Sequence, residues 1–140
     1  MVEFALVLPM LLLCFLGVTE LGRAVYYYNS ISNLAREGAR FGVVLQGQSR
    51  WRVDGNYRGT YSGIVAYSDT DTIVGAIASK AVIFDLSRTT VTIRADAGTW
   101  RALSLPLTVS VQYPFELLTA NWIGVSPTIT LMGQATMIIE

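Results

Sequence analysis

The side chains that could carry chemistry are few in this chain. Histidine is absent, which removes the commonest general base, the commonest metal ligand and every Ser-His or Cys-His pair. The single cysteine, Cys14, lies in an apolar run and behaves there as a small hydrophobic residue. Ser79 and Lys80 are neighbours on an expected helix, so their side chains point apart and do not form a catalytic pair. Asp69 and Asp71 are the nearest carboxylate pair, and helix capping accounts for them.

Signatures of cofactor, metal and nucleic-acid binding are also missing. Zinc would need clusters of Cys or His, and no glycine-rich phosphate loop follows a strand and opens a helix. Ten basic and ten acidic residues give a formal net charge of zero, so no basic surface can neutralise phosphates. We therefore predict a protein that is not an enzyme and has no cofactor, no metal and no nucleic-acid partner.

The first quarter of the chain is nearly free of charge. Phe4 to Thr19 is uncharged and is bracketed by Glu3 and Glu20. These residues would rise about 24 Å as a helix, against about 30 Å for a hydrocarbon core. The segment lacks the basic start and the small-residue cleavage site of a secretory signal. The remaining domain is too small to enclose a helix that is apolar on every face, so we expect residues 1–28 to lie in a membrane or in a filament core.

The helical pattern continues beyond this apolar segment. Tyr26, Tyr27 and Tyr28 would form an aromatic belt at a membrane boundary, and the same side chains could equally pack between subunits. Glycine costs about 1 kcal/mol against alanine inside a helix, so small residues at helical spacing predict close approach by another element. We expect one helix of about forty residues, apolar and then amphipathic, which Pro9 kinks or locally breaks. The small residues of the second half are Ala35, Gly38, Ala39 and Gly42.

Residues 46–68 show no dominant period, which predicts a long irregular loop with a short strand at 64–67. Trp51, Tyr57 and Tyr61 could form an adhesive or ligand surface on this loop. The alternative is a flap that packs on its own domain or on a neighbour. A second helix is expected over 69–86, with Asp69 or Asp71 as its N-cap. Its apolar stripe would contain Ile73, Ile77, Ala81 and Phe84.

From residue 88 the period changes to two, which predicts strands up to residue 140. Pro106 implies an edge, a bulge or the opening of a strand. A sheet with one apolar face needs helices to cover it. We predict an α+β fold in which the long N-terminal helix and a second helix pack on a small antiparallel sheet. The globular domain would cover residues 29–140, as helix 29–45, loop 46–68, helix 69–86 and strands over 88–140. The last strand would place Ile129, Leu131, Ala135, Met137 and Ile139 on one face.

Two segments of the long helix resemble the TadE/TadG-like family of tight-adherence, Flp-type pilus proteins. They are VEFALVLPMLLLCFLGVTELGRA, residues 2–24, and NLAREGARFG, residues 33–42. The resemblance implies a pilin-like fold and the life cycle of a type IV pilin. A prepilin peptidase removes a short basic leader, and the apolar helix waits in the inner membrane. With the pilus assembly machinery, the subunit then joins a helical filament of identical copies.

The resemblance also assigns Glu3, Phe4 and Pro9 to the assembly segment. Glu3 would pair with the N-terminal amine of a neighbouring subunit, an ion pair that can set register without adding stability. In the family this glutamate lies fifth from the mature N-terminus and here it is third, so either two residues and a leader lie upstream or processing differs.

The function that the resemblance implies is a structural subunit of a type IV or Tad-like pilus that serves cell adhesion. It would occupy the bacterial or archaeal inner membrane before assembly and an extracellular filament afterwards. One alternative is a minor pseudopilin retained in the inner membrane for pilus assembly or secretion. The other is a membrane-anchored module that binds a ligand of the cell envelope.

Overall fold

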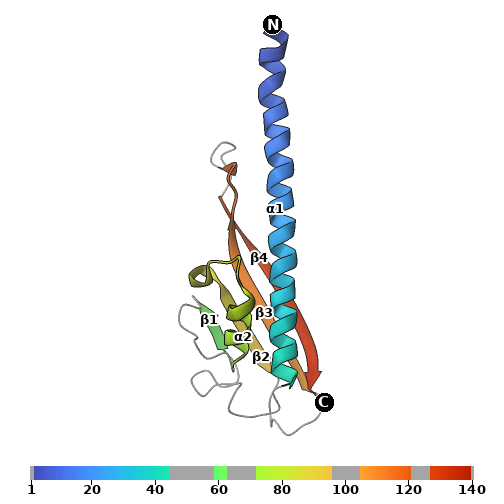
Figure 1. Cartoon of the computed structure of the whole chain (residues 1–140), viewed down its shortest axis with the longest axis vertical. Helices are drawn as coiled ribbons and strands as arrows, with labels where there is room; N and C mark the ends of the chain where they lie inside the picture. The colour runs from blue at the N-terminus through green and yellow to red at the C-terminus, as the bar shows by residue number, and fades with distance from the viewer. Residues whose placement is uncertain (1, 45–58, 63–71, 96–104, 121–126, 140) are drawn as a thin grey trace.

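The structure, a computed structural model, describes residues 2–44, 59–62, 72–95, 105–120 and 127–139. A long helix extends well beyond a small α+β body (Figure 1). The elements in chain order are α1 (Val2–Val44), β1 (Gly59–Ser62), α2 (Ile73–Lys80), the 3₁₀ turn η1 (Leu86–Arg88), β2 (Thr90–Ala95), β3 (Leu105–Glu116) and β4 (Thr128–Ile139). The predicted fold class is confirmed: a long N-terminal apolar helix and a short second helix pack on an antiparallel sheet.

Helix α1 is a single element of 43 residues, as the continuous helical pattern predicted. At 1.5 Å per residue it is about 65 Å long. The local break expected at Pro9 is wrong, because α1 runs through this residue. Proline removes one backbone hydrogen bond and crowds the carbonyl four residues earlier, which here belongs to the first turn of the helix.

The sheet has the strand order β1-β2-β3-β4, and every neighbouring pair is antiparallel. The strands predicted over residues 88–140 are present as β2, β3 and β4. Pro106 and Pro114 both lie in β3, a central strand, where a missing N–H is costly. Strand β2 pairs only with residues 107–112 of β3, so each proline lies where β3 has a partner on one side only.

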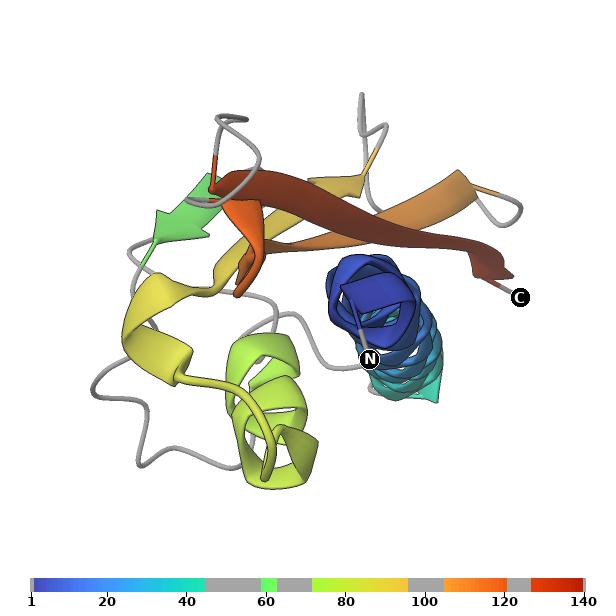
Figure 2. The same cartoon turned by 90° about the horizontal axis from the view of Figure 1, so that it is seen from above.

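Both helices lie on the same face of the sheet, side by side (Figure 2). The alternation of apolar residues in β2 and β3 turns one row of side chains toward the helices. Ile31 and Ile77, one from each helix, are completely buried against this row. A fully buried side chain of this size contributes about 1.5–3 kcal/mol, so this layer is the main stabilising contact of the body. The sheet contributes Val91, Ile93, Leu107, Val109, Val111 and Tyr113.

The second helix is shorter than the range 69–86 predicted for it. Helix α2 begins after Thr72, whose side chain accepts a hydrogen bond from the N–H of Gly75 at 3.0 Å. Thr72 is therefore the N-cap, in place of Asp69 or Asp71. The helix ends at Lys80, and the turn that follows exposes Val82. The turn also directs Phe84 into the core, so burial of this ring prevails over continuation of the helix.

One strand was missed and one lies outside the described residues. Residues 59–62 form β1, the short edge strand that pairs with β2, inside the range predicted as a loop. The strand expected at 64–67 falls outside the described residues. Four residues rich in Gly, Thr and Ser carry too little apolar alternation to announce a strand, so pairing with β2 decides their conformation.

Candidate assembly surface on helix α1

The N-terminal part of α1 has no partner within the described structure. Between Glu3 and Thr19 every described side chain is exposed except Leu16, which is half-buried. Large apolar side chains point outward all round the helix, with Phe4 71% and Met10 72% exposed. We call residues 3–19 the protruding segment; it extends beyond the body in Figure 1. A helix that is apolar on every side is stable only when lipid or other protein surrounds it.

The helix that carries the protruding segment is also a candidate for crossing a membrane. By length and composition α1 contains one candidate membrane span, and only 6% of its most apolar window is buried inside the structure. The residues assigned to assembly by resemblance, Glu3, Phe4 and Pro9, all lie here and are all exposed. Glu3 is in the first turn of α1, where the helix dipole favours a negative charge. Cys14 is a free, exposed thiol on the same segment.

The C-terminal part of α1 packs on the body through small residues. Ala35 and Ala39 are fully buried, and Gly38 and Gly42 are buried as well. A Cβ atom at Gly38 would lie 2.6 Å from Cδ1 of Ile77 in α2. At Gly42 it would collide with side chains of α2 and β3. The small residues thus lie where α1 meets both α2 and the sheet.

A third glycine of this contact, Gly133 in β4, was not singled out in the sequence. A Cβ atom there would lie 2.8 Å from the backbone C of Ile31 and 2.8 Å from the backbone N of Ser32. Strand β4 and helix α1 therefore approach backbone to backbone at this point. The available signal was the gap that Gly133 leaves between Leu131 and Ala135 in an otherwise apolar row.

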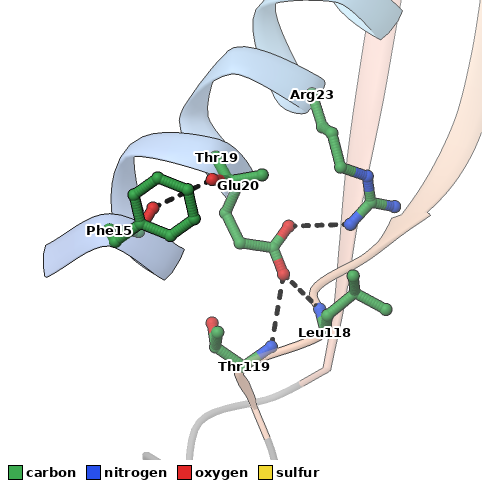
Figure 3. A network of polar contacts seen from close by, with 6 residues as sticks. All are labelled: Phe15, Thr19, Glu20, Arg23, Leu118 and Thr119. Carbon is green, nitrogen blue, oxygen red and sulfur yellow. Dashed lines mark hydrogen bonds and ion pairs between the residues drawn. The ribbon is translucent and has the colours of Figure 1, made fainter. Parts of the chain in front are cut away.

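Glu20 marks the boundary between the two parts of α1, and sequence reasoning missed its role. Its Oε1 accepts hydrogen bonds from the backbone N–H groups of Leu118 and Thr119, the latter at 3.2 Å (Figure 3). Its Oε2 lies 3.0 Å from Nη1 of Arg23. The Arg23 guanidinium also lies 5.1 Å from the centre of the Phe115 ring, a cation–π contact. Glu20 is 7% exposed, and these partners satisfy its charge.

The three tyrosines that follow have different environments. Tyr27 is part of an aromatic cluster in the body: it stacks on Tyr113 at 5.7 Å and contacts Phe84 and Phe115 edge-on. Such pairs contribute about 0.5–1.5 kcal/mol beyond their buried area. Tyr26 and Tyr28 are 54% and 51% exposed and are available to a membrane interface or to a neighbouring subunit. Tyr27 therefore serves the fold of its own chain, a role that neither interpretation of the sequence had given it.

Ionisable groups with shifted pKa values lie away from α1 and serve local structure. Two hydrogen bonds donated by Ser87, from its side chain and its backbone N–H, lower the pKa of Asp85, which caps η1. The Glu116 carboxylate, 2.6 Å from Arg88, raises the pKa of that guanidinium and joins η1 to the end of β3. Within the described ranges no three His, Cys, Asp or Glu side chains are grouped so that they could hold a metal ion.

The adhesive surface expected on residues 46–68 is described only at one position. Trp51 and Tyr57 lie outside the described residues. Tyr61 lies in β1, the edge strand, opposite Val91 of β2. An adhesive surface made of the three aromatic residues therefore stays a prediction.

Comparison with known proteins gives a match for the N-terminal helix. Neither the curated proteins nor the solved structures gave a match to this chain. The resemblance read from the two helix segments is confirmed by a family model. That model is described as TadE-like protein, and it matches residues 1–40, which are the protruding segment and most of the packed part of α1. Over these residues the chain is similar to the TadE-like family, and its hydrophobic N-terminal helix is consistent with a Tad pilus-associated protein.

Proposed function

We propose that this protein is a structural subunit of a Tad-like type IV pilus and assembles through α1. The observation that carries the proposal is the protruding segment, whose apolar side chains are exposed on all sides. Each large apolar side chain that becomes fully buried contributes about 1.5–3 kcal/mol. Lipid can surround the segment before assembly, and sister helices can surround it afterwards.

The rest of the chain supports this proposal because it leaves the protruding segment free. The aromatic cluster, the small residues and Glu20 hold the body against residues 20–44 of α1. The body therefore folds without covering the assembly surface. Identical copies that associate head to tail, so that one patch of the protruding segment meets a different patch on the next copy, form a helical filament when the repeated rotation does not close a ring.

Glu3 has a specific role in this proposal. Its carboxylate is exposed in the first turn of α1, so a neighbouring subunit can reach it. We assign to it an ion pair with the N-terminal amine of that neighbour. In a filament core such a pair sets the axial register more than it adds stability. Glu3→Gln should therefore reduce filament incorporation and leave the unfolding of the body unchanged.

The proposal is tested by shearing filaments from cells and locating the protein by immunoblot and negative-stain microscopy. The wild-type chain should be present in the sheared filaments. Leu11→Arg should be absent from them, because a charge at the centre of a membrane or a helix bundle costs about 2.5–3.5 kcal/mol or more. Ile138→Arg is the matched control, since Leu11 is 61% and Ile138 60% exposed, and Ile138 lies on the sheet.

Two results would contradict the proposal. Recovery of the wild-type chain only from the detergent-extracted inner membrane would identify a retained pseudopilin. Normal assembly of Leu11→Arg would show that the protruding segment is not the assembly surface.

A further inference from the structure

The turn end of the β3–β4 hairpin lies beside the middle of α1. It consists of residues 117–120 and 127–129, which we call the hairpin tip. The N–H of Leu117 donates to the carbonyl of Pro127 at 2.7 Å and closes the tip. The tip is fixed at one level of α1, because Glu20 accepts hydrogen bonds from Leu118 and Thr119. Figure 1 shows the upper ends of β3 and β4 at this height along the helix.

The length of the protruding segment determines where a bilayer surface would cut α1. A hydrocarbon core of about 30 Å needs about 20 helical residues. The uncharged run from Phe4 to Thr19 is shorter than this, and twenty residues counted from Phe4 end at Arg23. Glu20 would then lie about 4.5 Å inside the hydrocarbon boundary. Tilting the helix by about 20° moves Glu20 only slightly.

The contacts of Glu20 reduce the free-energy cost of placing its carboxylate at this depth. An isolated carboxylate at the edge of the hydrocarbon is costly, whereas one that is paired and hydrogen-bonded is not excluded. Glu20 has a cation at 3.0 Å and two backbone donors. Arg23 is about one-third exposed, so its guanidinium can also reach the headgroups. Tyr26 and Tyr28, exposed and just beyond Arg23, lie at the level that interfacial aromatic residues prefer.

The side chains of the hairpin tip suit the same environment. Leu118 is 71% and Ile129 48% exposed, although both are large and apolar. Leu118 lies beside Glu20, next to the exposed Leu21. Ile129 pairs with Phe115, whose ring contacts Arg23 one turn further along α1. We infer that the hairpin tip enters the headgroup–acyl boundary beside α1 while the subunit waits in the membrane. The bilayer is thus contacted twice, by the helix and by the sheet. This inference rests on the membrane-inserted stage of the proposed function.

The test measures the depth of three single cysteines in the full chain. One is the native Cys14; the others are Leu118→Cys and Ile138→Cys, each made with Cys14→Ala. Each thiol is labelled with a polarity-sensitive fluorophore in phosphatidylcholine–phosphatidylglycerol vesicles at low protein density. Spin-labelled lipids carry the quencher either near the headgroup or near the end of the acyl chain. Ile138 is the matched control, because it is exposed and pairs with Pro106 at the opposite end of β3.

The inference predicts loss of fluorescence at two of the three positions. The label at Cys14 should be quenched most by the deep quencher, and the label at position 118 most by the shallow one. The label at position 138 should be quenched by neither. If position 118 behaves like position 138 while Cys14 is quenched, the inference is overturned and the proposed function stands. Quenching at 118 that appears only at high protein density would show contact with a sister subunit and also overturn it. If Cys14 is not quenched, the helix does not insert, and the inference fails with the membrane stage of the proposed function.

Discussion

Replacement of Gly133 by alanine tests how α1 is held against the sheet. The added methyl would lie 2.8 Å from two backbone atoms of α1, the C of Ile31 and the N of Ser32. Neither atom can move by a change of rotamer, and Gly133 is itself fixed in a strand paired with Val111. The helix and the strand must therefore separate. We predict that Gly133→Ala loosens the whole contact between α1 and β4.

The expected loss of stability follows from two opposing contributions. Overpacking of a well-packed contact costs about 1–3 kcal/mol, and rigid backbone on both sides places this site at the upper end. Alanine recovers about 0.5–1 kcal/mol of backbone entropy relative to glycine in a strand. The net loss is about 2–2.5 kcal/mol. For a chain of this size, with about 4 °C of Tm for each kcal/mol, Tm should fall by about 10 °C.

Two helix glycines provide matched controls. At Gly22 an added Cβ meets nothing within 4 Å. Gly22→Ala should therefore leave Tm unchanged or raise it, because the higher helix propensity of alanine adds up to about 1 kcal/mol to the free energy of unfolding. At Gly38 the nearest atoms are Cδ1 of Ile77 at 2.6 Å and Cγ1 of the same side chain at 2.9 Å, which can shift by rotation of that side chain whereas backbone cannot. Gly38→Ala should therefore cost only about 1 kcal/mol, since a strained rotamer costs about that much and helix propensity offsets part of it.

The measurement is thermal unfolding in detergent, followed by near-UV circular dichroism of the aromatic cluster. The predicted order of Tm is Gly22→Ala highest, then Gly38→Ala, then Gly133→Ala. An unchanged Tm for Gly133→Ala would refute the backbone-to-backbone contact. An equal loss for Gly38→Ala would refute the distinction between rigid and flexible neighbours.

Three further substitutions probe other contacts. Tyr27→Ala should lower the free energy of unfolding by about 3–5 kcal/mol, because it opens the aromatic cluster. Tyr26→Ala removes a half-exposed ring and should lower it by less than about 1 kcal/mol; a denaturant titration measures both. Glu20→Ala should cost about 1–3 kcal/mol and speed amide exchange at the hairpin tip, since two backbone donors lose their acceptor. The pKa of Asp85 is lower in the folded chain than its unfolded value near 3.8, so the ionised carboxylate stabilises the fold at pH values above 3.8. This contribution is lost as pH falls through the lower pKa of the folded chain. The stability difference between wild type and Asp85→Asn should therefore be largest at neutral pH and shrink below about pH 4, as pH-dependent unfolding will show.

The elements with strong periodicity could be predicted from the sequence. The long helix and the three long strands follow from runs of apolar residues with a period near 3.6 or of two, which local geometry enforces. The end of α2 could not be predicted, because Ala81 and Phe84 continue the helical stripe and are buried by a turn instead. Strand β1 could not be predicted either, because only its pairing with β2 defines it.

The candidate assembly surface also has features that could be predicted from the sequence and features that could not. The exposure of the protruding segment could be predicted from composition, because the helix is apolar on every face and a small body cannot bury that much apolar surface. The role of Glu20 depends on the N–H groups of Leu118 and Thr119, 98 and 99 residues away, which no local pattern connects to it. Gly133 is of the same kind, because its partner is the backbone of a helix about one hundred residues earlier. Single contacts to backbone atoms, whether from a side chain or from another backbone, leave little trace in periodicity.

The continuity of α1 has a mechanical consequence. The same uninterrupted helix forms the protruding segment and carries the body, with no linker between them. Tension applied to the body therefore passes along the axis of a helix about 65 Å long, through backbone hydrogen bonds that bear load together in each turn. In the filament proposed above, bending would be taken up mainly where one copy slides against the next, because α1 is continuous from Val2 to Val44. A filament built from such subunits would owe its stiffness to the rods and its elasticity to their contacts.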